Sequence, residues 1–368
     1  MAGGRSGSCS QMTAAQQDAA PEDGTPHMGG NAIHRFGNTA VLALQTADAS
    51  RVVTSDALDD ALADTYRRVG LRPGLLERLA GIRERRWWGE GVTFVEGAAE
   101  AGAKAISESG VDPAAIGLMV NTSVSRKHLE PSTAVAVHHA LGLPRSCQNF
   151  DVTNACLGFV NGMELAAAMI DSGMVEYALV VNGEDSRPVQ ERTLERLNEP
   201  GTTSKDVIAQ FATLTLGSGA VAMVLGRADR HPEGHRLVAS VSRAGTEHHE
   251  LCVGDNDLMR TDLKGLLDAG LALSQDMWAD AAAEVDWASG MDRYIVHQVS
   301  KVHTKAMCDR FSIDPALVPT TFPVRGNLGP ASVPYTLAGQ QDSLSGGDRV
   351  LLMGIGSGLN VSCLELAW

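Results

Sequence analysis

The alternation of short apolar runs with segments of helical character restricts the fold of this chain more than any other feature. Predicted strands lie at residues 116–120, 178–181, 219–225, 237–241, 294–296, 350–353 and 361–366. Predicted helices lie at residues 55–68, 92–109, 161–171, 263–278 and 302–311, and Ser55 is expected to cap the first of them. This alternation favours a layered α/β architecture. The parts on either side of residue 230 have similar strand and helix content, which predicts two comparable halves.

The composition argues against several classes of protein. The chain has 368 residues, of which 44% are hydrophobic, so it is long enough to bury a large core. Its formal net charge of -14 argues against binding to nucleic acid or to an anionic membrane, because both need clustered Lys and Arg. We find neither an apolar run as long as a membrane span nor the pattern of a secretory signal, so a cytoplasmic protein is expected.

The cysteines and the N-terminal segment set further limits. Six cysteines are scattered without a CxxC pair, so free thiols are expected rather than disulfides, and a zinc site of the common spacings is not expected. Residues 1–31 are rich in Gly, Ser, Ala, Gln and Asp and have few large apolar side chains, which predicts a disordered extension. Residues 32–230 and 231–368 are then the two halves of the folded part.

Cys156 stands in the most informative stretch, residues 154–158 (NACLG), where a predicted strand gives way to a helix. A thiol at the start of a helix lies at the positive end of the helix dipole, which lowers its pKa and favours the thiolate. Small residues such as Gly158 and Gly162 allow close helix packing and a narrow approach for a substrate. A buried structural cysteine is the alternative, and for Cys156 taken alone it is the more common outcome.

Three other stretches carry candidate polar groups. His297 follows an apolar strand run that would present it to a cleft, and a core histidine is the alternative; His303 on the next helix is the weaker candidate. Asn327 lies in a Gly- and Pro-rich turn, either as a turn former or as an amide donor beside His297. Residues 354–358 (GIGSG) lack the Lys of a phosphate-binding loop, so we interpret them as a turn whose backbone N–H groups approach a substrate.

Polar and basic segments add weaker candidates. Glu130 precedes a proline in a polar loop, where an acidic residue is usually only solvated. Trp87 and Trp88 follow Arg85 and Arg86, and they form either the end of a surface helix or a place where a nucleotide stacks and its phosphates contact arginine. The polar stretch 186–205 is interpreted as a loop near the site or near an interface.

In this order, the motifs together resemble those of the thiolase superfamily, and in particular its ketoacyl synthase III-like branch. The resemblance extends from residue 33 to residue 368 and implies a thiolase fold, in which two pseudo-repeated halves form a layered αβαβα core. The matching motifs are the nucleophile elbow (154–158), the histidine strand end (296–298), the asparagine turn (326–332) and the last oxyanion turn (354–358). The catalytic Cys–His–Asn set implied by this resemblance is Cys156, His297 and Asn327.

Within that branch the chain is similar to the OleA group, which condenses two fatty acyl-CoA molecules head to head. The similar segments are 121–126, 129–134 and 155–163. By this resemblance Glu130 matches the catalytic base of the group, which the fold delivers across a homodimer interface into the neighbouring subunit's site. The backbone N–H groups of Cys156 and of Gly356 or Ser357 would hold the oxyanion, and Arg85 and Arg86 are expected by position to contact CoA phosphates.

The resemblance implies a non-decarboxylative Claisen condensation of two fatty acyl-CoA molecules, in long-chain olefin or β-lactone biosynthesis. The product is a 2-alkyl-3-ketoacyl compound, and hydrolysis yields a β-keto acid. Acyl-CoA enters as substrate, and neither a tightly bound cofactor nor a metal is expected. The carboxylate of Glu130 favours this reaction, because a decarboxylating synthase forms its carbanion by losing carbon dioxide and needs no such base.

Three alternatives stay open at this level. The chain could be a ketoacyl synthase III that uses malonyl thioester on acyl carrier protein. It could be the catalytic subunit of a heterodimeric synthase of a β-lactone pathway, in which the partner supplies the base. It could also be a non-catalytic scaffold that binds acyl chains, although the joint presence of Cys156, His297, Asn327 and Glu130 argues against that role.

Overall fold

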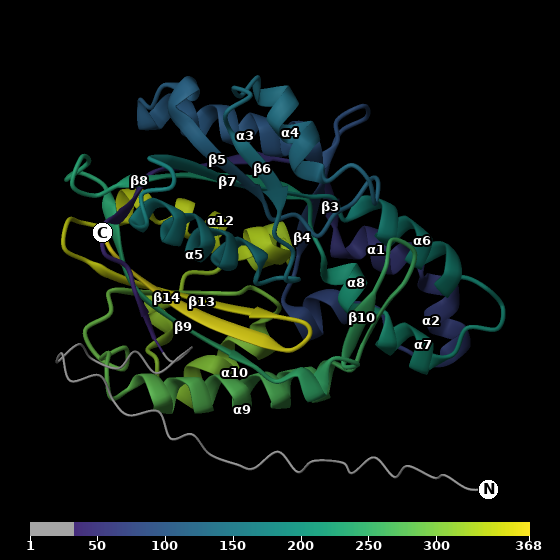
Figure 1. Ribbon diagram of the computed structural model, residues 1–368. Helices are drawn as coiled ribbons and strands as arrows, with labels where there is room; N and C mark the ends of the chain where they lie inside the picture. Colours follow the sequence, from purple (N-terminus) through teal and green to yellow (C-terminus); the bar gives the residue numbers. More distant parts are fainter. Residues whose placement is uncertain (1–32) are drawn as a thin grey trace, which may run out of the picture.

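The computed structural model describes residues 33–368, and the predicted disorder of residues 1–31 lies outside that range. The described chain is built in five layers, helix on sheet on helix on sheet on helix (Figure 1). Helices α3 and α4 cover one half of the sheet, α5 and α12 fill the middle, and α9 and α10 cover the other half. This arrangement confirms the predicted layered αβαβα core.

Ten strands of the described chain form one continuous sheet that bends around the middle helices. Its order is β12-β13-β14-β9-β2-β8-β7-β5-β6, with β1 paired to β9. Its members are β1 (His34–Arg35), β2 (Thr39–Asp48), β5 (Ile116–Asn121), β6 (Gln148–Asp151), β7 (Tyr177–Glu184), β8 (Gly219–Arg227), β9 (His235–Ala244), β12 (Arg293–Val296), β13 (Arg349–Gly356) and β14 (Asn360–Ala367). β5 runs parallel to both β6 and β7, so the carboxyl ends of these three strands lie at one edge of the sheet.

The two halves of the sheet meet where β2 pairs with β9, at Ala40–Arg236 and Val41–His235. The expected division at residue 230 falls between β8 and β9. The sheet nevertheless continues through this junction, and β1 near the start of the described chain pairs with β9 of the second half. The halves therefore share one framework, which holds groups from both at fixed positions.

The helices differ from the predicted ones mainly at their ends. They are α1 (Ser55–Ala61), α2 (Ala63–Val69), α3 (Phe94–Ser109), α4 (Thr133–Leu141), α5 (Gly158–Asp171), α6 (Arg187–Leu197), α7 (Ser204–Ala209), α8 (Phe211–Thr215), α9 (Leu263–Ala281), α10 (Lys301–Phe311), α11 (Phe322–Arg325) and α12 (Ser332–Ala338). The single helix predicted over 55–68 is interrupted at Leu62. Its cap is Thr54, because the Ser55 hydroxyl is buried and donates to the Ile82 carbonyl at 2.5 Å.

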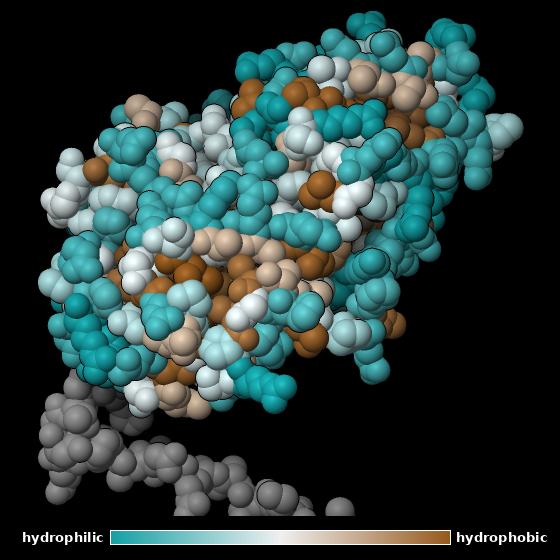
Figure 2. Space-filling view, turned by 90° about the horizontal axis from the view of Figure 1, so that it is seen from above, coloured by the Kyte–Doolittle hydropathy of each residue, from teal (hydrophilic) through white to brown (hydrophobic). Residues whose placement is uncertain are grey.

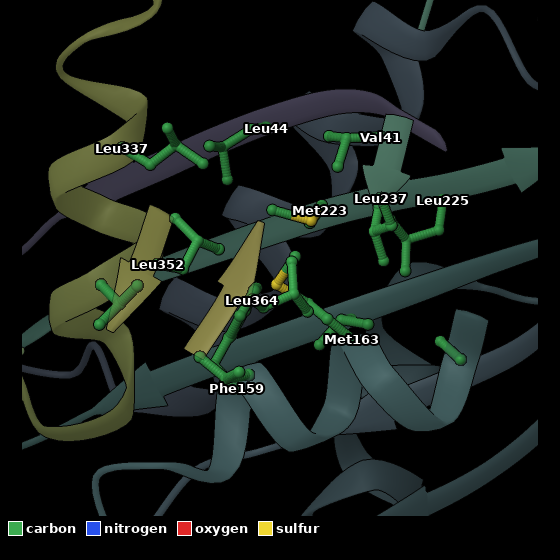
Figure 3. Packing of buried hydrophobic residues seen from close by; sticks show 14 of the residues in the cluster. Val41, Leu44, Phe159, Met163, Met223, Leu225, Leu237, Leu337, Leu352 and Leu364 are labelled. Atoms are coloured by element: carbon green, nitrogen blue, oxygen red, sulfur yellow. The ribbon is translucent and has the colours of Figure 1, made fainter. Parts of the chain in front are cut away.

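Helix α5 is the centre of the main core. Phe159 and Met163 on this helix point toward Leu364 of β14, while Leu337 of α12 faces Leu44 of β2 (Figure 3). Phe159 and Met163 are fully buried, and burying each such side chain contributes roughly 1.5–3 kcal/mol. The segment that follows Cys156 is therefore fixed by apolar contacts from both halves of the sheet.

A smaller group of elements lies beside the layers, to the right in Figure 1. It contains α1, α2, α6, α7 and α8 with the hairpins β3 (Arg51–Thr54)–β4 (Glu84–Trp87) and β10 (Cys252–Gly254)–β11 (Met259–Thr261). The interpretation of residues 186–205 as a loop is wrong, because α6 occupies most of this stretch and α7 begins within it. Gln190 on α6 is buried and bonded to Trp87, Thr213 and Leu216, so its polar character is satisfied inside the protein.

Seen from above, the layer of α3 and α4 exposes separate hydrophobic patches between hydrophilic residues (Figure 2). Within residues 33–368, no helix combines the length and the apolar character needed to cross a lipid bilayer.

Candidate active site

Cys156 lies in a tight elbow between β6 and α5. The N–H of Leu157 donates to the Asn154 carbonyl at 3.0 Å, and the N–H of Gly158 donates to the Ala155 carbonyl at 3.2 Å. Ala155 has a φ of 44°, in the left-handed region that residues with a Cβ rarely adopt. Such strain persists only where the surroundings hold it and is common beside reactive groups. The elbow therefore has the backbone geometry expected next to a nucleophile.

Two glycines let other segments close in on this elbow. A Cβ on Gly356 would lie 2.7 Å from the Asn154 carbonyl oxygen, and one on Gly162 would lie 2.8 Å from Thr122 Cγ2. Asn360 Nδ2 also donates to Asn154 Oδ1 at 3.2 Å. The last turn of the chain is thus tied to the elbow, and the backbones of Cys156 and Gly356, the predicted oxyanion donors, belong to neighbouring segments. Ser357 follows in the same turn.

The surroundings of Cys156 disfavour the thiolate in the free protein. Cys156 is partly buried, and burial raises the pKa of its thiol to about 12, with smaller contributions from Cys252 and Glu184. The sequence predicted the opposite shift from the helix dipole. That prediction is wrong because removing a thiolate from water costs more than a helix end contributes. Cys156 therefore needs a base before it can act as a nucleophile.

His297 lies on a segment bonded to the strand that leads into the same turn. Its backbone N–H donates to the Met353 carbonyl at 2.8 Å, and β13 continues from there to Gly356. The side chain is 3% exposed, and its Nδ1 has no hydrogen-bond partner among residues 33–368. Burial lowers the pKa of His297 to about 3, with a further contribution from His303. The imidazole is therefore neutral near pH 7 and can accept a proton.

Asn327 is held so that its amide donor is available. Its N–H donates to the Thr215 carbonyl at 2.8 Å, and its carbonyl accepts from Gly217 at the same distance. Its side-chain Oδ1 accepts from the N–H of Gly329 at 2.9 Å and from Ser332 Oγ at 3.4 Å. In the described part of the chain its Nδ2 donates to no other residue, so this group can serve a substrate oxygen.

His303 lies behind His297 on α10. Burial lowers the pKa of His303 to about 4, so both histidines are neutral near pH 7. His303 lines a cavity together with Met277, Met307, Met353 and Ile355. Because thioether and alkyl groups make up most of this wall, the cavity suits an apolar occupant.

Glu130 lies apart from these groups. It is exposed on the loop between β5 and α4, and it makes no hydrogen bond or ion pair with any residue in 33–368. The neighbouring Leu129 is 95% exposed. Among carboxylates of the same chain, Glu184 and not Glu130 contributes to the raised pKa of the Cys156 thiol.

The expected contact between Arg85 and CoA phosphates is contradicted by burial. Arg85 is 0% exposed, and its guanidinium donates to Ser55 Oγ and to the Leu214 carbonyl, each at 3.1 Å. Arg86 is partly exposed and pairs with Glu84 at 3.1 Å. The stacking interpretation of the tryptophans is also wrong, because Trp87 and Trp88 are both buried.

Sequence reasoning missed Glu184, which is buried at the end of β7. Burial raises the pKa of this carboxyl group, while hydrogen bonds from Ser125 and Val124 lower it. A signal for it existed: Glu184 lies three positions after the apolar run 178–181, and the predicted strand 116–120 is likewise followed by a polar residue, Asn121. Polar groups at the carboxyl ends of adjacent parallel strands commonly meet at a site.

Comparison with known proteins adds independent information. A family model described as 3-oxoacyl-[acyl-carrier-protein (ACP)] synthase III matches residues 150–245, and the model of its C-terminal part matches residues 283–368. The acyl-CoA:acyl-CoA alkyltransferase of Xanthomonas campestris pv. campestris is 43% identical over 336 residues, which cover 90% of this chain and 99% of that protein. The protein of the same name from Shewanella oneidensis is 36% identical over 333 residues, covering 86% of this chain and 95% of that protein.

Solved structures match over the same range. Xanthomonas campestris OleA with bound cerulenin has a TM-score of 0.89 and 43% identity, covering 91% of this chain and 98% of that one. A variant of the same protein with bound lauric acid and lauroyl-CoA has a TM-score of 0.88 and 42% identity, covering 90% of this chain and 100% of that one.

Proposed function

Because this chain belongs to the OleA-type acyl-CoA:acyl-CoA alkyltransferases, a ketoacyl synthase III-like group of the thiolase superfamily, we propose that it condenses two fatty acyl-CoA molecules. The reaction is a Claisen condensation without decarboxylation, and its 2-alkyl-3-ketoacyl product yields a β-keto acid on hydrolysis. The single observation that carries the proposal is the 43% identity to an acyl-CoA:acyl-CoA alkyltransferase over 99% of that protein's length.

In the first half-reaction, Cys156 becomes acylated. Neutral His297 takes the proton from the Cys156 thiol, and the thiolate attacks the carbonyl carbon of the first acyl-CoA. The backbone N–H groups of Cys156 and of Gly356 or Ser357 donate to the oxyanion. The CoA thiolate then leaves and takes the proton from His297, so that the imidazole is neutral again and the acyl chain is bound to Cys156 as a thioester.

In the second half-reaction, a second acyl-CoA loses a proton from its α-carbon to Glu130. Asn327 Nδ2 and His297 donate to the enolate oxygen, which is where the negative charge accumulates. The α-carbon attacks the acyl-Cys156 thioester, the Cys156 thiolate leaves and is reprotonated, and a 3-ketoacyl-CoA results. Water then cleaves this thioester to the β-keto acid and CoA. The acyl thioesters supply all the activated groups, so the proposal includes no resident cofactor.

The base reaches the site from a second copy of the chain. β6 lies at the end of the sheet order, and no described strand pairs with its outer edge. Beside it, Val124, Leu129 and Val135 are 49%, 95% and 45% exposed. Burying these side chains against an identical subunit would remove apolar surface from water and carry Glu130 toward the partner's Cys156.

Two details complete the proposal. Arg86, whose side chain is partly exposed, contacts CoA phosphates. The enzyme works in the cytoplasm, where acyl-CoA is formed, and its product enters olefin or β-lactone biosynthesis.

Purified protein given acyl-CoA of graded chain lengths tests the proposal. Mass spectrometry should detect β-keto acids, or the ketones formed from them, that contain two acyl chains, together with two released CoA molecules per product. Turnover by the isolated chain would exclude a required heterodimer partner. Product formed only with malonyl thioester on acyl carrier protein would instead establish the decarboxylating alternative. No turnover with either substrate would favour the non-catalytic scaffold that binds acyl chains.

A further inference from the structure

The loop that carries Glu130 runs from the end of β5 to the start of α4, and its longest exposed run is residues 127–131. Glu130 itself is bonded to no described residue. A general base must stay within hydrogen-bond reach of the proton that it takes, so its position has to be set by the ends of the loop. Each end of the loop is hydrogen-bonded to a different carboxylate.

Glu184 holds the first end of the loop. Its Oε1 accepts from the N–H of Val124 at 2.8 Å, and its Oε2 accepts from the N–H of Ser125 at 3.0 Å and from Ser125 Oγ at 2.7 Å. Asn182 Nδ2 donates to Oε1 at 3.2 Å. In addition, the N–H of Asp185 donates back to Ser125 Oγ at 2.9 Å. The loop is therefore bonded to the end of β7 from both directions.

Asp151 holds the second end. Its Oδ2 accepts from the N–H of Thr133 at 3.0 Å and pairs with Arg126 Nη1 at 3.0 Å. Its Oδ1 accepts from the N–H of Ala134 at 2.8 Å, at the start of α4. Asp151 is the last residue of β6, as Glu184 is the last residue of β7, and β5 lies between these two strands. The two carboxylates thus stand on either side of the strand from which the loop emerges.

We propose that Glu184 and Asp151 are positioning residues for condensation, which hold the two ends of the 124–134 loop so that Glu130 is presented at a defined place. This inference rests on the proposed role of Glu130 as the base. Neither carboxylate acts on substrate; each acts through the loop.

The chemistry of Glu184 favours this role over a merely structural one. Burying a carboxylate is costly unless several donors compensate for the lost water, and two of the donors here are backbone N–H groups of the loop itself. A glutamine at this position would keep the size but place an NH2 group opposite N–H groups. The loop would then lose acceptors at its first end while the bonds of Asp151 at the other end remain.

The variant Glu184→Gln tests the proposal. Acylation of Cys156, followed by intact-protein mass spectrometry after mixing with one acyl-CoA, should not fall below the wild-type rate, because the charge of Glu184 raises the pKa of the thiol and its loss does not hinder thiolate formation. Condensation should fall by about tenfold to a hundredfold in kcat with KM little changed, since a small displacement of a base costs about this much. Asp151→Asn should have the same selective effect. Equal loss in both half-reactions would overturn the proposal.

The double variant Glu130→Gln/Glu184→Gln tests whether Glu184 acts through Glu130. If it does, the double variant condenses no more slowly than Glu130→Gln alone. If the double variant lost condensation rate by the product of the two single losses, Glu184 would act elsewhere, for example on the turn of Asn327, and the assignment would be overturned. Glu365→Gln is the matched control, because this buried carboxylate is bonded to Trp287 and Arg349 away from the loop. It should lower the melting temperature without changing the ratio of the half-reactions.

A readout without substrate separates this inference from the proposed function. Trypsin should cut after Arg126 or Lys127 at least about fivefold faster in Glu184→Gln than in the wild type, because a loop released at one end opens more often. If Glu130→Gln kept full condensing activity, the base assignment would fail, while faster cleavage would still support the role of Glu184 in holding the loop. Unchanged cleavage together with unchanged condensation would overturn that role.

Discussion

The surroundings of Cys156 and of Glu130 are built in opposite ways. Cys156, His297 and Asn327 each stand on a segment that is hydrogen-bonded to the surrounding core, and Glu130 stands at the exposed tip of a loop fixed only at its ends. In the proposed mechanism, this difference means that acylation uses groups of one chain, whereas condensation uses a carboxylate that a second copy of the chain must cover. The experiments below test this division, beginning with the largest expected effect.

Replacing Cys156 by Ala should remove both half-reactions. Without the thiol no acyl-enzyme can form, so condensation should fall below about one thousandth of the wild-type rate. Intact-protein mass spectrometry should find no added acyl mass. The control is Cys147→Ala, which changes another cysteine and should still be acylated on Cys156 at the normal rate. Acyl transfer at an undiminished rate in Cys156→Ala would contradict the assignment of the nucleophile.

Glu130→Gln should separate the half-reactions. Acylation should persist within about twofold, because no step of it uses Glu130, while condensation should fall by about a hundredfold to ten-thousandfold with the loss of the base. The measurements are release of the first CoA in a single turnover and product formation in steady state. Full condensing activity would remove Glu130 from the mechanism.

Asn327→Asp should slow condensation by about a hundredfold to a thousandfold, since it keeps an oxygen for the N–H of Gly329 but removes the donor to the enolate. Steady-state product formation measures the effect, and the melting temperature verifies the fold. Asn198→Asp is the matched control, because Asn198 also uses Oδ1 as an acceptor and Nδ2 as a donor, away from the site. An equal loss in both variants would point to a general effect on the fold.

A mixed dimer should restore what each single variant loses. Differently tagged Cys156→Ala and Glu130→Gln chains, co-expressed and purified through both tags, would contain one site with both Cys156 and the partner's Glu130. Such a dimer should have about half of the wild-type condensing activity, since one of two sites is complete. An inactive mixed dimer would mean that Glu130 serves its own subunit or none.

The buried histidines should make the fold sensitive to acid. Burial lowers the pKa of His297 to about 3 and of His303 to about 4, from an ordinary value of 6.5. Below about pH 6.5 the unfolded chain binds protons that the folded chain does not, so the free energy of unfolding falls by about 1.4 kcal/mol per pH unit for each histidine. The free energy of unfolding, measured with urea between about pH 6.5 and pH 4.5, should fall less steeply with decreasing pH in His303→Gln, by the contribution of one histidine. An unchanged slope would contradict the burial effect.

Several elements were predictable because their signals are local. The apolar runs correctly located strands such as β5 and β13, and α3 ends at residue 109 as predicted, where Gly110 follows with a φ of 66°. Residues 186–205 were misread because α6 is polar on the outside and also buries Gln190, whose hydrogen-bond partners Trp87, Thr213 and Leu216 are distant in the sequence. Arg85 was misplaced for the same reason, since its partners Ser55 and Leu214 lie far from it in the sequence.

The sequence by itself determined which groups this protein has for chemistry: a cysteine at an elbow, a histidine at a strand end, an asparagine in a turn and a glutamate in a loop. These follow from motifs of a few residues, in which residue type and spacing suffice. Only the tertiary structure decided the protonation states of Cys156 and His297, because desolvation depends on what packs around a group. It also revealed Glu184, because the donors that justify burying this carboxylate lie on a loop about sixty residues earlier in the chain.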